Sequence, residues 1–347
     1  MLNEMRCLPR WLRGLTLACV SALGLVAIVG SGGGGYADAL LCTFTFQHCL
    51  GFSATMKSPF ITALVGTPVT FIVETHATAA FVSNTVTGPL SFQWRRSSDG
   101  GGTYVDIAGA TGATYSLASV NLSDDGAVFR VDVRVGNGGG VYTLGHLAVS
   151  ATPGIVFEDG EFLPANWFAS PAVDPPGTQT VHSEERLATG GNPDAFRRMV
   201  YQVTQAEVSA SVSLSASVFY TSLSATYDPA SQGAIYVIDY SEDCIAFQSP
   251  GSTVSNLLIE QGGRKYLSNT TGPCFLPTWS AVAGRSSLSL KDFRQVDGPA
   301  CVTGESCLDF SASALPMRFG YWRGSYVPPG VSLAYGIDNW KVTVWRR

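Results

Sequence analysis

Ser91-Phe-Gln-Trp-Arg-Arg96 and Asp124-Asp-Gly-Ala-Val-Phe-Arg-Val131 are the two stretches of this sequence that decide the fold. The first predicts an apolar strand centred on Trp94, and a Gly-rich hairpin loop follows it at residues 97–102. The second begins with an Asp-Asp-Gly turn and continues as a strand. In that strand, apolar residues from Phe129 to Val135 alternate with charged ones, which is the spacing of a strand with one buried face.

A Trp on a central strand, and an Asp-x-Gly turn before an aromatic residue two positions ahead of a core residue, form the core signature of an immunoglobulin-like sandwich. The sequence resembles the bacterial immunoglobulin-like modules of secreted and cell-surface proteins over residues 59–150. This resemblance implies that Trp94 lies in the core between two sheets. Strands are expected at residues 61–64, 69–75, 90–96, 114–117, 127–135 and 141–149. No Cys occurs between positions 49 and 244, so core packing must replace the disulfide that joins the sheets of antibody domains.

The residues after position 150 predict a second, larger β domain. Ser150-Ala-Thr-Pro-Gly154 is expected to be a linker, because Pro and Gly stop the preceding strand. Residues 155–347 contain several alternating runs separated by turns and no credible amphipathic helix, which favours a β-sandwich or jelly roll. The opening Phe157-Glu-Asp-Gly160 and the last strand, Asp338-Asn-Trp-Lys-Val342, are similar to jelly-roll modules of the galactose-binding-like and carbohydrate-binding type. The expected fold class is all-β, with an immunoglobulin-like β-sandwich followed by a larger jelly-roll β-sandwich.

Residues 1–39 have the pattern of a targeting segment. Three arginines precede an apolar stretch, Leu15–Val29, and Ala37-Asp-Ala39 resembles a signal-peptide cleavage site. This pattern predicts a signal peptide, with an uncleaved signal anchor as the alternative. We therefore expect an exported protein of the periplasm, cell surface or extracellular space, which contacts the membrane only through the leader if the leader is uncleaved. Residues 40–58 are expected to form a Cys-stapled spacer or hairpin.

Six of the eight cysteines lie outside the leader. They are Cys42, Cys49, Cys244, Cys274, Cys301 and Cys307. An even number of cysteines in an exported chain indicates disulfides, although six cysteines allow about fifteen connectivities. Pairing of sequence neighbours is preferred, because each bridge then closes a local loop. Zinc is disfavoured, because these cysteines lack the short spacing of a zinc motif and the four histidines are scattered.

Composition and motif searches argue against several classes of function. The net charge of −5 argues against nucleic acid as a partner. The sequence contains no nucleophile elbow, zinc-protease helix, Walker loop or dinucleotide fingerprint, so we expect neither catalysis nor a cofactor. The acidic segment Asp239-Tyr-Ser-Glu-Asp243 could form a second cation site or a catalytic carboxylate pair. A solvated loop next to Cys244 is the simpler interpretation.

The resemblance to jelly-roll modules also implies a candidate metal site. In those modules an opening acidic residue and an Asp of the last strand often hold a structural calcium, and the corresponding residues here are Glu158 and Asp338. Calcium takes about six to eight oxygen ligands, so backbone carbonyls and water would have to complete the site. The alternative is that Asp338 and Asn339 only shape the turn before the last strand.

Tyr321, Arg323 and Trp345 are the candidate ligand-binding residues. Aromatic rings can stack on sugar rings, and planar polar groups can bind sugar hydroxyls. Alternate residues of a strand share a face, so Tyr321 and Arg323 are expected together with Trp322 opposite them, and Trp345 is expected to point outward. The alternative is that most of these aromatic residues fill the core.

The function expected from these features is that of an exported bacterial binding or adhesion protein without catalytic activity. The jelly roll would bind the ligand, with a carbohydrate or an envelope protein as partner, and the immunoglobulin-like module would act as a spacer or protein-contact unit. Two alternatives remain open: a polysaccharide-active enzyme with an unrecognised carboxylate pair, and a purely structural envelope protein.

Overall fold

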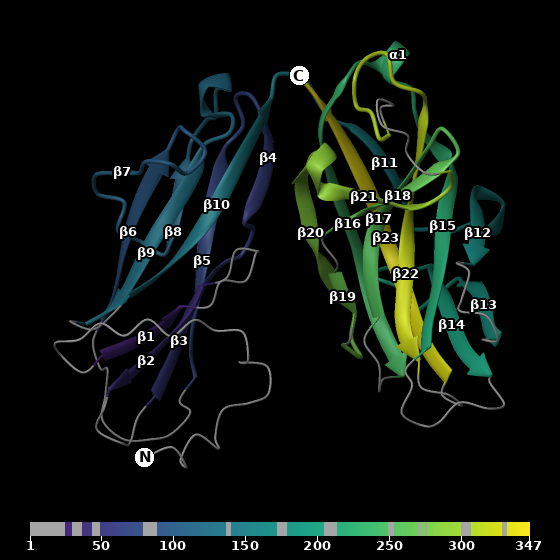
Figure 1. Cartoon of the computed structure of the whole chain (residues 1–347), viewed down its shortest axis with the longest axis horizontal. Coiled ribbons are helices and arrows are strands. Elements are labelled where there is room, and N and C mark those ends of the chain that lie inside the picture. The colour runs from purple at the N-terminus through teal and green to yellow at the C-terminus, as the bar shows by residue number, and fades with distance from the viewer. Residues whose placement is uncertain are drawn as a thin grey trace. The chain divides into compact units, whose positions relative to one another are not determined.

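The computed structural model divides into two compact units, residues 1–149 (unit 1) and 150–347 (unit 2), both built mainly from β-strands (Figure 1). The structure describes residues 25–29, 37–43, 49–78, 89–136, 140–171, 179–204, 214–248, 253–269, 272–274, 276–299, 307–327 and 332–347. Within these residues, no helix has the length and apolar character needed to cross a membrane. The chain is all-β, as expected.

Unit 1 contains two five-stranded sheets. Their orders are β1-β2-β3-β5-β8 and β4-β10-β9-β6-β7. The strands are β1 (Leu25–Val29), β2 (Ala37–Thr43), β3 (Cys49–Met56), β4 (Phe60–Leu64), β5 (Val69–Thr78), β6 (Leu90–Ser97), β7 (Val105–Asp106), β8 (Thr114–Leu117), β9 (Val128–Val135) and β10 (Gly140–Ser150). All six strands expected for the immunoglobulin-like module are present, because each has the period-two apolar pattern of a half-buried strand.

The core of unit 1 is apolar and aromatic. Trp94 is fully buried, with its ring centroid 5.7 Å from that of Tyr115, and the Phe71 and Phe129 centroids are 4.9 Å apart. The indole Nε1 of Trp94 donates a hydrogen bond of 2.9 Å to the carbonyl of Gly112. Because these rings come from strands of both sheets, they join the sheets where antibody domains have a disulfide. The expected immunoglobulin-like sandwich is confirmed.

Side chains hold the turn that precedes β9. Arg96 Nη1 lies 2.7 Å from Asp124 Oδ1, and Asp124 Oδ2 accepts a hydrogen bond of 2.8 Å from the Asn121 amide. Gly126 has a φ of +76°, a conformation that side chains with a Cβ atom adopt at a cost. In the Asp-x-Gly pattern, Asp124 therefore accepts the hydrogen bond that holds the turn, and Gly126 adopts the backbone conformation that reverses the chain.

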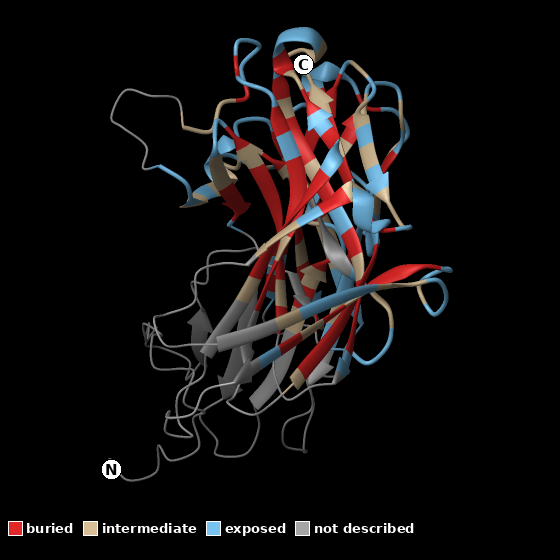
Figure 2. Ribbon diagram, turned by 90° about the vertical axis from the view of Figure 1, so that its right-hand side faces the viewer, coloured by how far each residue is buried: buried red, intermediate tan, exposed pale blue. Residues whose placement is uncertain are grey.

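Unit 2 is a jelly-roll sandwich of two sheets. One sheet has the order β13-β14-β23-β16-β20, with β11 also paired to β23, and the other has the order β12-β15-β22-β17-β18-β21, with β19 paired to β17. The elements are β11 (Ile155–Asp159), β12 (Trp167–Pro171), β13 (Gln179–Leu187), β14 (Phe196–Thr204), β15 (Leu214–Tyr227), α1 (Pro229–Gln232), β16 (Ile235–Gln248), β17 (Thr253–Gln261), β18 (Arg264–Ser268), β19 (Gly272–Cys274), β20 (Ser280–Leu288), β21 (Phe293–Asp297), β22 (Met317–Val327) and β23 (Ser332–Arg346). Figure 2 shows buried and exposed residues alternating along many of these strands.

Charged groups lie in the interior of unit 2. Arg323 on β22 is fully buried, and its Nη1 lies 2.9 Å from Oε1 of Glu242 on β16. The Tyr240 hydroxyl donates a hydrogen bond to the other Glu242 oxygen, and burial raises the pKa of Tyr240 well above its usual value. The acidic segment 239–243 is thus part of β16 and not a solvated loop. Glu242 of this segment points into the interior, and Asp239 accepts a hydrogen bond from the Trp345 indole.

A disulfide links the two sheets of unit 2. It joins Cys244 on β16 to Cys274 on β19, which confirms the expected pairing of these sequence neighbours. Cys307 is also disulfide-bonded, but Cys301, its expected partner, lies outside the described residues. Disulfide bonding of Cys244, Cys274 and Cys307 agrees with the disulfides expected from an even number of cysteines.

The spacer and the leader are described in part. Cys42 and Cys49 are opposite each other in the register of the β2–β3 hairpin, where a stapled hairpin was expected. Their side chains lie outside the described residues, so the disulfide between them stays a prediction. Residues 25–29, within the expected leader, form β1 beside β2. Cleavage of the leader also stays a prediction.

Candidate functional site

A row of polar and charged side chains crosses one sheet of unit 2. Thr226 on β15 and Glu260 on β17 are the register partners of Arg318 on β22, and Lys265 on β18 is the partner of Glu260. Residues opposite each other in antiparallel strands project to the same face of the sheet. Phe319, the neighbour of Arg318, is buried in the core, so the row lies on the outer face.

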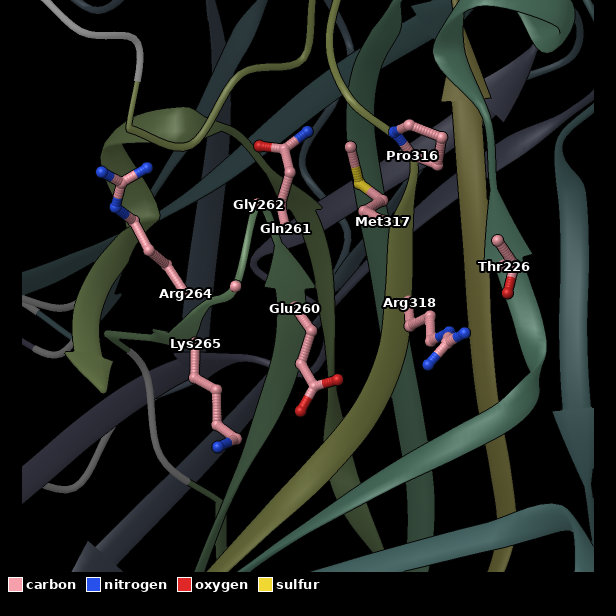
Figure 3. A pocket seen from close by; sticks show the side chains of 10 residues that line it. Thr226, Glu260, Gln261, Gly262, Arg264, Lys265, Pro316, Met317 and Arg318 are labelled. Carbon is pink, nitrogen blue, oxygen red and sulfur yellow. The ribbon is translucent and has the colours of Figure 1, made fainter. Parts of the chain in front are cut away.

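A cavity of about 500 Å³ opens over this row (Figure 3). Its lining residues are Thr226, Glu260, Gln261, Gly262, Gly263, Arg264, Lys265, Pro316, Met317 and Arg318. In Figure 3 the side chain of Glu260 lies between those of Lys265 and Arg318. We call this cavity the outer-face cleft. It combines apolar surface with polar and charged side chains, most of which come from adjacent strands, so the sheet itself positions them.

Two of the charged groups in the outer-face cleft are held by neighbours. Lys265 Nζ lies 2.7 Å from Asp297 Oδ2, and this hydrogen bond lowers the pKa of Asp297. Glu260 Oε1 accepts a hydrogen bond of 2.8 Å from the Thr221 hydroxyl. Arg318 is exposed, and among the residues that the structure describes it makes neither a hydrogen bond nor an ion pair. Its guanidinium is therefore available to a ligand.

One rim of the cleft is fixed by the side chain of Gln261. This amide is buried, and its Nε2 donates hydrogen bonds to the carbonyls of Asp309 and Leu315 at 3.0 and 2.8 Å. Its Oε1 accepts a hydrogen bond of 2.9 Å from the Asp309 amide. Gly262 and Gly263 form the tight β17–β18 turn beside it with φ values of +57° and +73°. The cleft is therefore bounded by elements that are already hydrogen-bonded.

An aromatic surface lies on the same outer face. Trp322 lies four residues after Arg318 on β22, so the two side chains project from the same face of the strand, and Trp322 is partly exposed. It packs against a small apolar cluster that contains Phe219 and Leu258. A Cβ atom at Gly324 would lie 2.1 Å from the outer edge of the Trp322 ring, so the indole occupies the space that a side chain at this position would need. The face thus offers an aromatic ring along the strand that carries the unpaired guanidinium.

The ligand-binding residues expected from the sequence do not share one surface. Tyr321 and Arg323 do lie on one side of β22 with Trp322 on the other, but the structure places the first two in the interior, both 0% exposed. Arg323 can lie in the interior because the buried carboxylate of Glu242 compensates the charge of its guanidinium. Trp345 is half-buried on the other sheet, and its Nε1 donates a hydrogen bond of 2.8 Å to Asp239. As placed, Tyr321 and Arg323 present no surface for stacking.

The two residues expected to bind calcium are engaged with other partners in the structure. Glu158 is exposed, and its carboxylate lies 3.3 Å from Lys341 Nζ, its register partner. Asp338 is buried, and its oxygens accept hydrogen bonds from the Asn192 and Asn339 amides at 2.5 and 2.7 Å. Among the described residues, no group of three or more acidic, His or Cys side chains could hold a metal. Asp338 lies inside β23 and not in a turn before it, so the turn alternative is wrong in its placement, and its carboxylate joins β23 to the backbone at Asn192.

Sequence reasoning missed Glu260, Lys265 and Thr226. Each lies in a strand whose pattern was recognised, but the cleft depends on which residues of four strands are opposite one another. Strand register does not follow from the spacing within a single strand. The signal that was present is the alternation at 318, 320 and 322 on β22, which would have placed Arg318 and Trp322 on one face.

The chain matches no protein-family model and no curated protein sequence. Three solved structures illustrate what it is distantly similar to. A family 11 carbohydrate-binding module from Clostridium thermocellum, in complex with a β-1,3-1,4-mixed-linked tetrasaccharide, is 14% identical, with 56% of this chain and 97% of that chain covered and a TM-score of 0.35. The CBM22-1 xylan-binding domain from Paenibacillus barcinonensis is 9% identical, with 57% and 99% covered and a TM-score of 0.26.

The third match contains immunoglobulin domains. It is the complex of Dpr2 Ig1-Ig2 with DIP-Theta Ig1-Ig3, at 11% identity, with 56% of this chain and 88% of that chain covered and a TM-score of 0.20. These scores and identities are too low to transfer a binding site. The function of this chain is therefore argued from its own residues.

Proposed function

We propose that this chain is an exported carbohydrate-binding protein without catalytic activity, and that the outer-face cleft of unit 2 is its binding site. The observation that carries the proposal is that one face of β22 presents the unpaired guanidinium of Arg318 in the cleft and, four residues further along the strand and outside the cleft lining, the partly exposed indole of Trp322. A sugar offers hydroxyls at its edge and C–H groups on its ring face. A planar polar group and an aromatic ring on the same face of a strand are complementary to these two parts of a sugar.

The surrounding cleft supports this use. Small-ligand sites are concave and combine an apolar surface with a few placed polar groups. Glu260 adds a carboxylate that accepts hydrogen bonds from hydroxyls, and its bond to Thr221 restrains it before a ligand arrives. The disulfide between Cys244 and Cys274 is consistent with an oxidising compartment outside the cytoplasm, where such glycans occur.

Binding without hydrolysis is the function that the lining favours. Glycosidases generally use two carboxyl groups on either side of the bond that is broken. Glu260 is the single carboxylate among the described residues that line the outer-face cleft. In this proposal unit 1 serves as a spacer or protein-contact module.

A glycan array probed with the purified chain tests this proposal. We expect binding to a subset of polysaccharides, weakened by Glu260→Gln and by Trp322→Ala. Phe247→Ala is the matched control, because this exposed aromatic residue lies on the other sheet of unit 2 and its loss should leave binding unchanged. An array without binding would overturn the proposal. Release of reducing sugar from a bound glycan would overturn the non-catalytic part.

A further inference from the structure

The charge of the outer-face cleft is opposite to that of the whole chain. Its lining contains three cationic side chains, Arg264, Lys265 and Arg318, and one carboxylate, Glu260, so the lining carries +3 − 1 = +2. The chain as a whole carries −5. A concave site concentrates the potential of its own charges. Asp297, which lies outside the lining but is paired with Lys265, offsets one of these charges, so the cleft keeps a small net positive charge on an acidic protein.

The three cations differ in how far they are already engaged. Lys265 forms an ion pair with Asp297, and Arg264 Nε donates a hydrogen bond of 2.9 Å to the Pro299 carbonyl. Arg318 has no such bond among the described residues, although it is the direct cross-strand partner of Glu260. A cross-strand charge ladder that only stabilised the sheet would join these two side chains in an ion pair. The Glu260 carboxylate is instead held by Thr221.

The exposed, unpaired guanidinium of Arg318 can bind an anion that has two or more oxygens, such as a carboxylate or a sulfate. Its N–H groups form a rigid fork that matches two oxygens of a carboxylate or sulfate group. Thr226 and Glu260, on either side of Arg318, can bind hydroxyls but would disfavour a second negative charge at the Glu260 position. This arrangement fits a ligand with one anionic group flanked by hydroxyls.

We propose that the outer-face cleft selects acidic glycans, with the carboxylate or sulfate of an anionic sugar residue bound by Arg318 and its neighbouring hydroxyls bound by Glu260 and Thr226. This inference deepens the proposed function and rests on it. Arg318 is then the residue that distinguishes an acidic from a neutral sugar. The uronate and sulfate forms share this chemistry and are separated by the test below.

The test measures binding of the full-length chain by calorimetry to matched pairs of polysaccharides. One pair is polygalacturonate and its methyl ester, and the other is a sulfated galactan and its desulfated form. Each pair differs in charge but not in its sugar backbone. We expect one acidic member to bind and its neutral counterpart to bind at least about tenfold more weakly, and we expect added salt to weaken binding to the acidic member.

Variants assign this selectivity to Arg318. Arg318→Gln is expected to weaken binding to the acidic member about tenfold or more, and Arg318→Lys, which retains charge without the fork, to an intermediate extent. Arg134→Gln, which removes an exposed arginine of unit 1, is the matched control and should change nothing. Equal binding to both members of each pair, or unchanged binding of Arg318→Gln, would overturn the acidic-glycan inference and leave the proposed function standing. Binding to no glycan would overturn both.

Discussion

The interiors of the two units differ in kind. The core of unit 1 is built from apolar and aromatic side chains around Trp94, which needs one hydrogen bond to satisfy its indole. The core of unit 2 contains the buried ion pair of Arg323 and Glu242, together with several tyrosines. Unit 1 can be recognised from hydrophobic spacing, because most of its buried positions are apolar. Unit 2 cannot, because its interior is specified by partners that lie on different strands.

The difference also changes how each core responds to a lost group. Removing an apolar side chain costs its transfer free energy and the cavity left behind. Removing one member of a buried ion pair leaves an uncompensated charge, which costs more than the pair contributed. Arg323 is fully buried. Burial acts to lower the pKa of its guanidinium, but the neighbouring Glu242 carboxylate helps to hold that pKa above its ordinary value. Unit 2 therefore depends on single contacts more strongly than unit 1 does.

The largest expected effect is that of Glu242→Gln. This change leaves the Arg323 charge buried without its counter-ion, and we expect a loss of roughly 3 to 5 kcal/mol in the stability of unit 2. Denaturant unfolding gives the free energy, and hydrogen exchange resolved by peptide assigns the loss to β16 and β22. Glu185→Gln is the matched control, because the Glu185–Arg198 pair is exposed and should contribute less than about 1 kcal/mol.

A double variant tests whether the buried charge is the cause of this loss of stability. Replacing both partners, with Glu242→Leu and Arg323→Met together, should recover most of the stability, since no charge is then buried. A double variant as unstable as Glu242→Gln would show that the polar contacts themselves hold the two sheets in place.

An intermediate effect is expected in unit 1. Val131→Ala removes two methyl groups from a fully buried position and should cost about 2 kcal/mol, confined to unit 1 in the exchange experiment. Val105→Ala, at a position that is 72% exposed, should be neutral within about 0.5 kcal/mol. Equal effects of the two substitutions would contradict the apolar core described here.

The smallest effect concerns the pH dependence of Asp297, the ion-pair partner of the cleft residue Lys265. The hydrogen bond from Lys265, followed by that of the Gly298 amide, lowers the pKa of Asp297 below its ordinary value of 3.8. The ionised carboxylate therefore stabilises unit 2 above that value, and this contribution is lost as pH falls through the lowered pKa. Asp297→Asn should remove roughly 0.5 kcal/mol at neutral pH and flatten stability below pH 4, measured by unfolding across acid pH. Steeper acid loss in the variant would contradict this assignment.

The sequence was sufficient where burial follows a simple alternation and insufficient where it does not. The strands around Trp94 and Phe129 were predicted closely, because valines and aromatic residues occupy most of their buried positions. On β22 the same alternation was visible, but Tyr321 and Arg323 have polar ends, and no local pattern says that Glu242, eighty-one positions earlier, receives the arginine. The cleft was missed for the related reason that Thr226, Glu260 and Lys265 meet only through strand register.

The last strand has a consequence for how the protein is made. β23 pairs with β11, β14 and β16, all of which come earlier in the chain. Until residues 332–346 have left the ribosome, these three strands each have an open edge that can pair with another chain. Unit 2 therefore completes this sheet only after β23 has been made, and its assembly waits for contacts between distant parts of the sequence, which form slowly. A truncated product that lacks β23 would be a substrate for chaperones and proteases, not a smaller working domain.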